Sequence, residues 1–210
     1  MTNNYNTLAP FYQLISRLVF GKSLLNAQYC FLSKLKDANS ILILGGGSGE
    51  FLPRLLEINP LAKIDYIEPS EKMIKLCKKN LSDFQLDLLQ FHQTTFQDFS
   101  HQSNKYDAVL CFFFLDLFPE SKTATIIQEL YDQLHDSGRF FVADFHEPKS
   151  IKEQIAAKLM FSFLKISTNI ENKQLYNLHP ILNHSKLKLI EEKQFSKGFV
   201  FSSVWKKSAT

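Results

Sequence analysis

Short apolar runs alternate along this chain with longer stretches in which apolar residues recur every three or four positions. The first run, 41–44, leads directly into the glycine-rich stretch 45–49, and Phe51, Leu52, Leu55 and Leu56 then recur at helical spacing. A short apolar run predicts a buried strand, and the spacing of three or four predicts an amphipathic helix. The same reading predicts further strands at 63–68, 86–91, 106–114, 139–144, 186–193 and 199–205.

Helical patterns separate these runs. The spacing predicts helices at 8–19, 24–35, 70–81, 121–134 and 149–165, of which the first two form a helical preface before the first strand. Strands and helices that alternate through five units predict an α/β fold, a Rossmann-like doubly wound parallel sheet with helices on both faces. The short turn 196–198 forces the last two strands to be antiparallel. We expect a single domain over 1–210, with the preface at 1–38 and the α/β core at 39–210.

Composition narrows the class of protein. With 210 residues, 45% of them apolar and 21% charged, the chain is long enough for a full globular core. The net charge of +3 is small, and Arg17, Arg54 and Arg139 are the arginines of the chain. Because arginine is the side chain best suited to bidentate contacts with bases and phosphates, this balance argues against a nucleic-acid partner.

The cysteines and the apolar runs bear on the cellular compartment. Cys30, Cys77 and Cys111 are far apart and fit neither a disulfide framework nor a metal site, so we expect no metal and a reducing environment. The polar start of the chain, 1–4, lacks the basic-then-apolar pattern of a signal peptide, and the longest apolar run, 108–115, is too short for a membrane span. These features predict a cytoplasmic protein without a membrane span.

The glycine turn and an acid after the second strand carry the chemical signal. The spacing Gly45-x-Gly47-x-Gly49 departs from the dinucleotide fingerprint, because Glu50 stands where its third glycine belongs. Glu68 lies 19 residues after Gly49, where an acid can accept hydrogen bonds from both ribose hydroxyls. The pair favours a nucleoside over a pyrophosphate; the plainer alternative is an ordinary turn with a surface acid.

These residues resemble the class I S-adenosylmethionine-dependent methyltransferase family. The resemblance covers nearly the whole chain: the glycine turn, Glu68, the strand at 106–110 and the closing antiparallel pair. Residues 5–12 also look like the N-terminal signature of its ubiquinone/menaquinone-biosynthesis branch, although Asn6 and Gln13 stand where that branch usually has aspartate. The resemblance implies a seven-stranded sheet of order 3-2-1-4-5-7-6 with strand 7 antiparallel.

The resemblance also implies a set of contacts with S-adenosyl-L-methionine. The glycines would let the backbone approach the methionine part, Glu68 would hold the ribose, and other residues would frame the adenine and the ammonium group. One departure is Ile43, which stands where the family commonly has an acid that helps to bind the ammonium group. The implied cofactor-binding residues are Gly45, Gly46, Gly47, Gly49, Glu68, Pro69, Met73, Thr95, Phe96, Cys111 and Tyr12, with Tyr5 closing over the cofactor beside Tyr12.

The expected reaction is a direct displacement at the sulfonium methyl group, for which the protein mainly aligns donor and acceptor. A base is needed only where the acceptor must lose a proton. Asp116, after the fourth strand, and Asp144 and His146, at the end of the fifth, lie at the edge of the sheet that binds ligands, and His146 and Asp116 are the candidate catalytic residues. For His146 the alternative is a solvated loop histidine.

The absence of two motifs of nucleic-acid methyltransferases narrows the class of acceptor. The chain lacks an Asn/Asp-Pro-Pro-Tyr/Phe motif after the fourth strand, and no proline precedes Cys111, so nucleic-acid methylation is unsupported. We therefore expect a small apolar or aromatic acceptor. Two alternatives stay open: a non-catalytic member that binds the cofactor or a partner, and a nicotinamide-dependent oxidoreductase. The apolar stretch 155–164 predicts a packed helix face, with a lid or a homodimer surface as the alternatives.

Overall fold

The computed structural model describes residues 20–99, 105–167, 172 and 174–207. The expected helix at 8–19 and the proposed contacts of Tyr5 and Tyr12 lie outside these residues. Within them, the strands form one seven-stranded sheet in the order β3-β2-β1-β4-β5-β7-β6, as the resemblance implied. The strands are β1 (Ser40–Leu44), β2 (Lys63–Ile67), β3 (Leu89–His92), β4 (Tyr106–Phe112), β5 (Leu134–Phe145), β6 (Leu187–Phe195) and β7 (Val200–Lys207).

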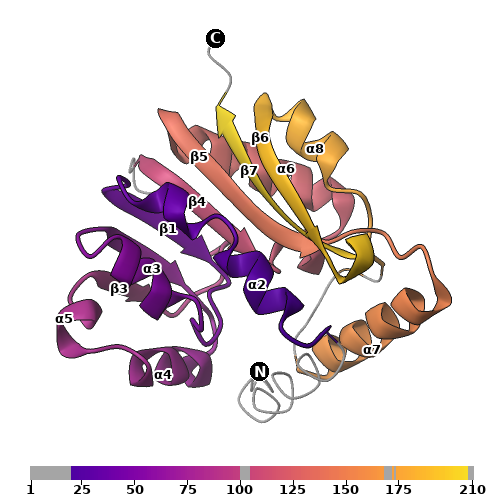
Figure 1. Cartoon of the computed structure of the whole chain (residues 1–210), viewed down its shortest axis with the longest axis horizontal. Helices are drawn as coiled ribbons and strands as arrows, with labels where there is room; N and C mark the ends of the chain where they lie inside the picture. Colours follow the sequence, from indigo (N-terminus) through magenta and orange to yellow (C-terminus); the bar gives the residue numbers. More distant parts are fainter. Residues whose placement is uncertain (1–19, 100–104, 168–171, 173, 208–210) are drawn as a thin grey trace.

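Helices cover both faces of the sheet. In Figure 1, α2 crosses in front of the strands and α6 runs behind them. The helices are α2 (Ser23–Tyr29), α3 (Leu52–Ile58), α4 (Glu71–Lys79), α5 (Asp83–Leu86), α6 (Glu120–Gln133), α7 (Ile151–Ser167) and α8 (His179–His184). Three short 3-10 helices add η1 (Leu32–Leu35), η2 (Leu115–Leu117) and η3 (Ser196–Gly198).

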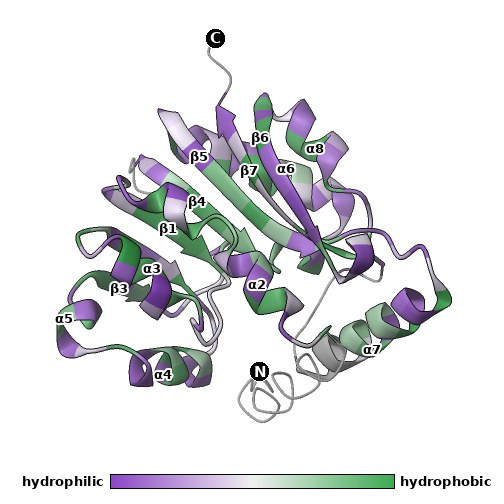
Figure 2. Ribbon diagram, in the orientation of Figure 1, coloured by the Kyte–Doolittle hydropathy of each residue, from purple (hydrophilic) through white to green (hydrophobic). Residues whose placement is uncertain are grey.

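Each face of the sheet packs against its own apolar core. Residues of one parity along the strands pack with α2, α3 and α7, whereas the other parity packs with α6 and α8. On β4, for example, Leu110 belongs to the first core and Val109 to the second. Apolar residues accordingly dominate the central strands β1, β4 and β5 (Figure 2). Buried on both faces, these strands read in the sequence as continuous apolar runs.

The parallel pairing of the strands places their carboxyl ends at one edge of the sheet, where we expect ligands to bind. Strands β1, β2, β4 and β5 run parallel, so their carboxyl ends meet at one edge of the sheet. The last strand, β7, is antiparallel to both β5 and β6, and η3 forms the predicted turn between β6 and β7. None of the helices that the structure describes is both long and apolar enough to cross a membrane.

Three predicted boundaries were wrong. The third strand begins at Leu89 instead of residue 86, because Ser82 and Gln85 form a reciprocal capping box that starts α5. The fourth strand ends at Phe112 instead of residue 114, because Phe113 adopts a positive φ of 54°. The fifth strand begins at Leu134 instead of residue 139, although its pairing with β4 passes from Leu134 directly to Arg139.

The helical preface is also more broken than predicted. Its second helix ends at Tyr29, and the rest of the predicted stretch 24–35 continues as the 3-10 helix η1. The short helix α8 was not predicted, because its six residues give too little periodicity to detect. Ser70 is the N-cap of α4, since its hydroxyl accepts a hydrogen bond from the Met73 amide.

Candidate functional site

The glycine turn after β1 has the backbone geometry for which glycine is suited. Gly45, Gly47 and Gly49 have φ angles of 60°, 62° and 63°, in the left-handed region that L side chains rarely adopt. Gly46 is required for space, because a Cβ at this position would lie 2.1 Å from Cζ of Tyr66. At Gly47, by contrast, an added Cβ would meet no atom within 4 Å. The turn is therefore packed against β2 at Gly46 and open at Gly47.

Hydrogen bonds fasten this turn to the end of β2. The Gly46 amide donates to the Ile67 carbonyl at 3.3 Å, and the Tyr66 hydroxyl donates to the Gly47 carbonyl at 3.0 Å. The Gly47 amide donates to Oε2 of Glu68 at 2.9 Å. The two features that the sequence singled out, the glycine turn and the acid, are thus in direct contact.

Glu68 is a buried carboxylate with acceptor capacity to spare. Its side chain is only 5% exposed, and burial raises its pKa, while hydrogen bonds from the Ser70 and Gly47 amides act in the opposite direction. The Ser70 amide donates to Oε1 at 2.9 Å. Since an ionised carboxylate offers about four lone-pair sites, these two bonds leave room for two more donors. A pair of ribose hydroxyls would supply two donors.

A pocket of about 770 Å³ lies between the glycine turn, α2 and the end of β4. Of the predicted cofactor-binding residues, Gly45, Gly46, Gly47, Gly49 and Met73 line it. The lining also includes Phe112 and Phe113, two charged residues (Lys22 and Glu50), and several residues of α2, among them Leu25 and Tyr29. The residues from α2 were missed, because nothing in an amphipathic helix pattern indicates which side chains face a ligand.

The other predicted cofactor residues of the described chain, Glu68 among them, lie outside this lining. Thr95 is exposed and donates from its hydroxyl to Oδ2 of Asp98 at 2.7 Å. Phe96 is buried against Phe114, with 6.4 Å between the ring centroids. Cys111 is buried in the core on the α6 side, and Pro69 lies half-buried beside Glu68. Their roles in cofactor binding stay predictions.

Ile43, which replaces the expected acid, is a core residue. It is 1% exposed and belongs to the apolar core on the α2 side. Glu50 is instead the acid that lines the pocket, at the position where the dinucleotide fingerprint would have glycine. The pocket therefore contains one acidic and one basic side chain from the described part of the chain, Glu50 and Lys22.

A buried carboxyl pair lies at the ends of β4 and β5. Asp144 is fully buried and accepts hydrogen bonds from the amides of Phe145 at 2.8 Å and of Asp116 at 3.3 Å. Asp116 is 4% exposed, and its Oδ1 is buried without a hydrogen-bond partner. Burial raises the pKa of Asp116 to about 7. Burial, followed by repulsion from Asp116, also raises the pKa of Asp144.

His146 lies just past the end of β5. Its ring is half-buried, stacks on Phe201 with 4.5 Å between centroids, and has a buried Nε2 without a hydrogen-bond partner. Burial lowers its pKa, with a further contribution from His179. The candidate bases Asp116 and His146 thus share one property: each has a polar atom that the described protein leaves unsatisfied.

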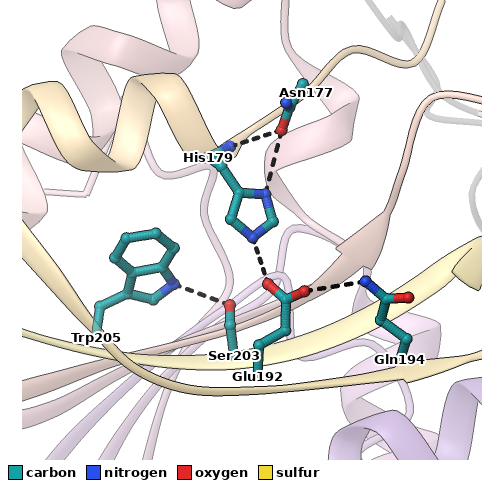
Figure 3. Close-up of polar contacts among 6 residues, drawn as sticks. All are labelled: Asn177, His179, Glu192, Gln194, Ser203 and Trp205. Atoms are coloured by element: carbon teal, nitrogen blue, oxygen red, sulfur yellow. Dashed lines mark hydrogen bonds and ion pairs between the residues drawn. The ribbon is translucent and has the colours of Figure 1, made fainter.

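A second histidine lies beside His146. The rings of His146 and His179 are stacked with 5.4 Å between centroids and 15° between planes. Figure 3 shows how His179 is held: Oδ1 of Asn177 lies 3.2 Å from its Nδ1, and the Glu192 carboxylate contacts its Nε2. Nothing in the sequence indicated this cluster, because its members come from separate elements and show no ligand spacing.

No group of three or more acidic, histidine or cysteine residues within the described ranges could hold a metal ion. The glycine turn, the acid after β2 and the adjacent pocket instead define a class of protein. It is a doubly wound α/β protein with a pocket of about 770 Å³ at the carboxyl edge of its sheet, where such folds bind ligands.

Comparison with known proteins points to one family within that class. Residues 41–138 match the family model for the methyltransferase domain. This match and the sheet order of the described chain support a relationship to the class I S-adenosylmethionine-dependent methyltransferase family. S-adenosylmethionine is the cofactor of that family.

Curated relatives match only in part. The polyamine aminopropyltransferase of Saccharolobus solfataricus is 30% identical over 122 residues, which cover 50% of this chain and 37% of that protein. The polyamine aminopropyltransferase of Prochlorococcus marinus is 36% identical over 52 residues, 25% of this chain and 18% of that protein. The matches thus span well under half the length of these relatives.

Solved structures share the fold at low identity. The mitomycin 7-O-methyltransferase MmcR superposes with a TM-score of 0.70 at 16% identity, over 97% of this chain and 60% of that chain. Human N-acetylserotonin methyltransferase in complex with SAM gives 0.66 at 14% identity, over 94% and 56%. A chain from the complex between the Haloferax volcanii Trm112 activator and a putative methyltransferase gives 0.74 at 11%, over 100% of both chains.

Proposed function

We propose that this protein binds S-adenosylmethionine in the pocket beside the glycine turn and transfers its methyl group to a small acceptor. The observation that carries the proposal is the contact between the Glu68 carboxylate and the amide of Gly47, a residue that lines a pocket of about 770 Å³. Pockets of about 300–1,000 Å³ typically hold small molecules and cofactors, a class that includes S-adenosylmethionine. When bound, the sulfonium group supplies an electrophilic methyl carbon.

The residues of the pocket, together with Glu68 beside Gly47, fit the donor in two respects. Gly47, where an added Cβ would meet no atom within 4 Å, lets a ligand approach the backbone, and Glu68 keeps lone pairs for ribose hydroxyls. Lys22 and Glu50 supply one positive and one negative charge, which match the carboxylate and ammonium groups of an amino-acid tail. The chain's contribution is to bind and align the donor, which is the main requirement of a direct displacement.

Titration calorimetry tests donor binding. We expect S-adenosylhomocysteine to bind and NADH not to bind. Glu68→Ala should weaken the binding of S-adenosylhomocysteine at least tenfold, about 1.4 kcal/mol, whereas Glu71→Ala, an exposed acid on α4, should not change it. Binding of NADH alone would favour an oxidoreductase, and binding of neither would favour a member that works without a cofactor.

A double-mutant cycle separates direct ribose contact from support of the turn. An analogue of S-adenosylhomocysteine without the two ribose hydroxyls should bind more weakly than the parent to the wild type. It should bind Glu68→Ala about as well as the parent does, because the hydroxyls then have lost their acceptor. Equal losses in both proteins would mean that Glu68 acts only by holding the Gly47 amide.

The curated relatives raise a second candidate, the transfer of an aminopropyl group. The donor of such a reaction lacks the carboxylate of S-adenosylmethionine, so the proposed role of Lys22 favours methyl transfer. We expect Lys22→Met to weaken the binding of S-adenosylhomocysteine and to leave that of 5′-methylthioadenosine, which has no amino-acid tail, unchanged. Preferential binding of a decarboxylated donor would support aminopropyl transfer instead.

We propose a small molecule as the acceptor, bound at the edge formed by the ends of β4 and β5. The solved neighbours that share the fold include methyltransferases of mitomycin and N-acetylserotonin, both small molecules. Phe113 lines the pocket and packs at a tilt against Phe145, the residue before His146, with 5.1 Å between ring centroids. Incubation of metabolite extracts with a donor labelled in its methyl group would identify the acceptor.

A further inference from the structure

Phe113 has a backbone conformation that is rare for an aromatic residue. Its φ of 54° lies in the left-handed region, where a residue with a Cβ atom is crowded and pays a cost in free energy. Phe113 directly follows the central strand β4, at the end that borders the pocket. The other described residues with a positive φ, glycines apart, are polar and lie in the connections at the two ends of β6: Lys186, Ser196 and Lys197. Backbone strain of this kind tends to occur at ligand sites, which makes Phe113 a candidate for a role in binding.

A hydrogen bond and ring packing hold Phe113 in this conformation. Its amide donates to the Ala143 carbonyl at 2.7 Å, so the link between the end of β4 and β5 is kept. Its ring packs at a tilt against Phe145, with 5.1 Å between centroids. Phe145 is 1% exposed and packs in turn against Phe20 and Phe199, at 5.3 Å and 5.4 Å between centroids. The ring of Phe113 is therefore supported by a packed aromatic cluster.

The left-handed conformation changes the face of the sheet on which Phe113 lies. Successive residues of a strand point to opposite faces. On β4, Leu110 and Phe112 belong to the core on the α2 side, and Cys111 belongs to the core on the α6 side. Phe113 would come next on the α6 side, but it packs against the α2-side core, and Phe114 lies in the other. Phe112 and Phe113 consequently both line the pocket, although they are adjacent in the chain.

The ring of Phe113 is accessible from the pocket. Phe113 is half-buried, whereas Phe112 is 8% exposed and packs edge-on against Phe51 with 5.0 Å between centroids. Phe113 is therefore the more accessible of the two phenylalanines. Aromatic rings favour tilted or offset pairs over other contacts of the same area. An aromatic ring of a ligand would continue the tilted arrangement of Phe145 and Phe113.

We infer that Phe113 is a specificity-determining residue, whose left-handed backbone turns its ring into the pocket to pack against an aromatic ring of the methyl acceptor. The inference rests on the function proposed above and narrows the small acceptor to an aromatic one. Phe113 has no polar side-chain atom, so its part is to orient the acceptor beside the donor. A saturated acceptor and the sulfonium group of the donor, which an aromatic face attracts, are the alternatives that the experiment separates.

Matched aromatic and saturated probes test the inference. The pairs are 2-naphthol with decahydro-2-naphthol and phenol with cyclohexanol, titrated by nuclear magnetic resonance with and without S-adenosylhomocysteine. The wild type should bind at least one aromatic probe about threefold or more tighter than its saturated counterpart. Phe113→Leu, which keeps an apolar side chain, should lose this preference and keep its affinity for S-adenosylhomocysteine. Phe84→Leu, at a side chain that is 63% exposed on α5, is the matched control and should keep both.

Several results would overturn the inference. Equal binding within both pairs by the wild type, or no binding of any probe, would show that the pocket does not select aromatic rings. A preference that survives in Phe113→Leu would show that another residue provides it. If Phe113→Leu binds S-adenosylmethionine more weakly but S-adenosylhomocysteine as before, the ring faces the sulfonium group of the donor instead.

Two further measurements keep the test decisive. If Phe113→Leu fails to fold, nuclear Overhauser contacts between the Phe113 ring and a bound aromatic probe in the wild type take its place, and their absence would refute the inference. Calorimetry of the wild type with S-adenosylhomocysteine tests the proposed function separately. An aromatic preference without any binding of S-adenosylhomocysteine would support the role of Phe113 in binding and refute the assignment of the donor.

Discussion

Replacing Asp116 by asparagine should change how the stability of the protein depends on pH. Burial raises the pKa of Asp116 from 3.8 to about 7 in the folded protein. Between these values the folded state holds a proton that the unfolded chain has lost. Stability therefore falls as the pH rises from about 4 through about 7, and an asparagine, which does not ionise, removes this loss.

The size of the effect follows from the shift. A rise from 3.8 to about 7 is about three pH units, and each unit corresponds to about 1.4 kcal/mol. The loss of stability caused by Asp116 is then about 2 kcal/mol near pH 5 and about 4 kcal/mol above pH 8. The stability of Asp116→Asn relative to the wild type should therefore increase by about 2–3 kcal/mol between these two conditions.

Urea unfolding at about pH 5 and about pH 8.5 measures this difference. The asparagine amide also lacks a partner, but that cost is the same at both pH values and cancels in the comparison. Asp37→Asn, at a side chain that is 87% exposed, is the matched control and should show no change with pH. A stability difference for Asp116→Asn that stays constant between the two pH values would refute the reasoning.

The remaining predictions concern the glycine turn and the thiols. Gly46→Ala places a Cβ 2.1 Å from the Tyr66 ring and should lower stability by about 1–3 kcal/mol, whereas Gly47→Ala meets open space and should cost only the strain of its φ, about 1–2 kcal/mol. Thermal melts compare the two variants, and a larger loss for Gly47→Ala would contradict the packing argument. Burial raises the pKa of the Cys77 thiol to about 11 and also that of Cys111. Mass spectrometry should therefore find both thiols unmodified by iodoacetamide near pH 8 until the protein unfolds; rapid labelling of the native protein would disprove this.

The apolar pattern predicted the strands and most helices, because the central parallel strands are buried on both faces. The strand order came from the resemblance to the family. Where local hydrogen bonds decide the boundary, as at Ser82, or a backbone angle does, as at Phe113, the pattern misplaced the strand ends. The residues of the proposed donor site could be named from the sequence, because a glycine cluster and an acid at a fixed spacing form a recognisable pattern along the chain. The contact between Gly47 and Glu68 confirms that these two features belong together.

The residues of the proposed acceptor site could be named only in part from the sequence. Asp116 and His146 could be named from their places after β4 and β5, but their burial could not be inferred from sequence. His179 and Glu192 approach His146 only because β6 and β7 fold back beside β5. Contacts of this kind depend on tertiary packing between distant segments, and no local pattern encodes them.

The residues proposed to bind the donor and those proposed to face the acceptor lie mainly in different parts of the chain, and this affects how the protein could be altered. Apart from Lys22, the residues proposed to hold the donor come from the glycine turn, the residue after β2 and α4, within the matched stretch 41–138. At the proposed acceptor edge, Phe113 lies within this stretch too, whereas Phe145 and His146 lie beyond it. A chimera that exchanged residues 139–207 for those of another member of the fold would therefore be expected to change acceptor choice while keeping the donor. In the proposed function, the residues that bind the methyl donor and those that face the acceptor thus come mainly from different parts of the chain.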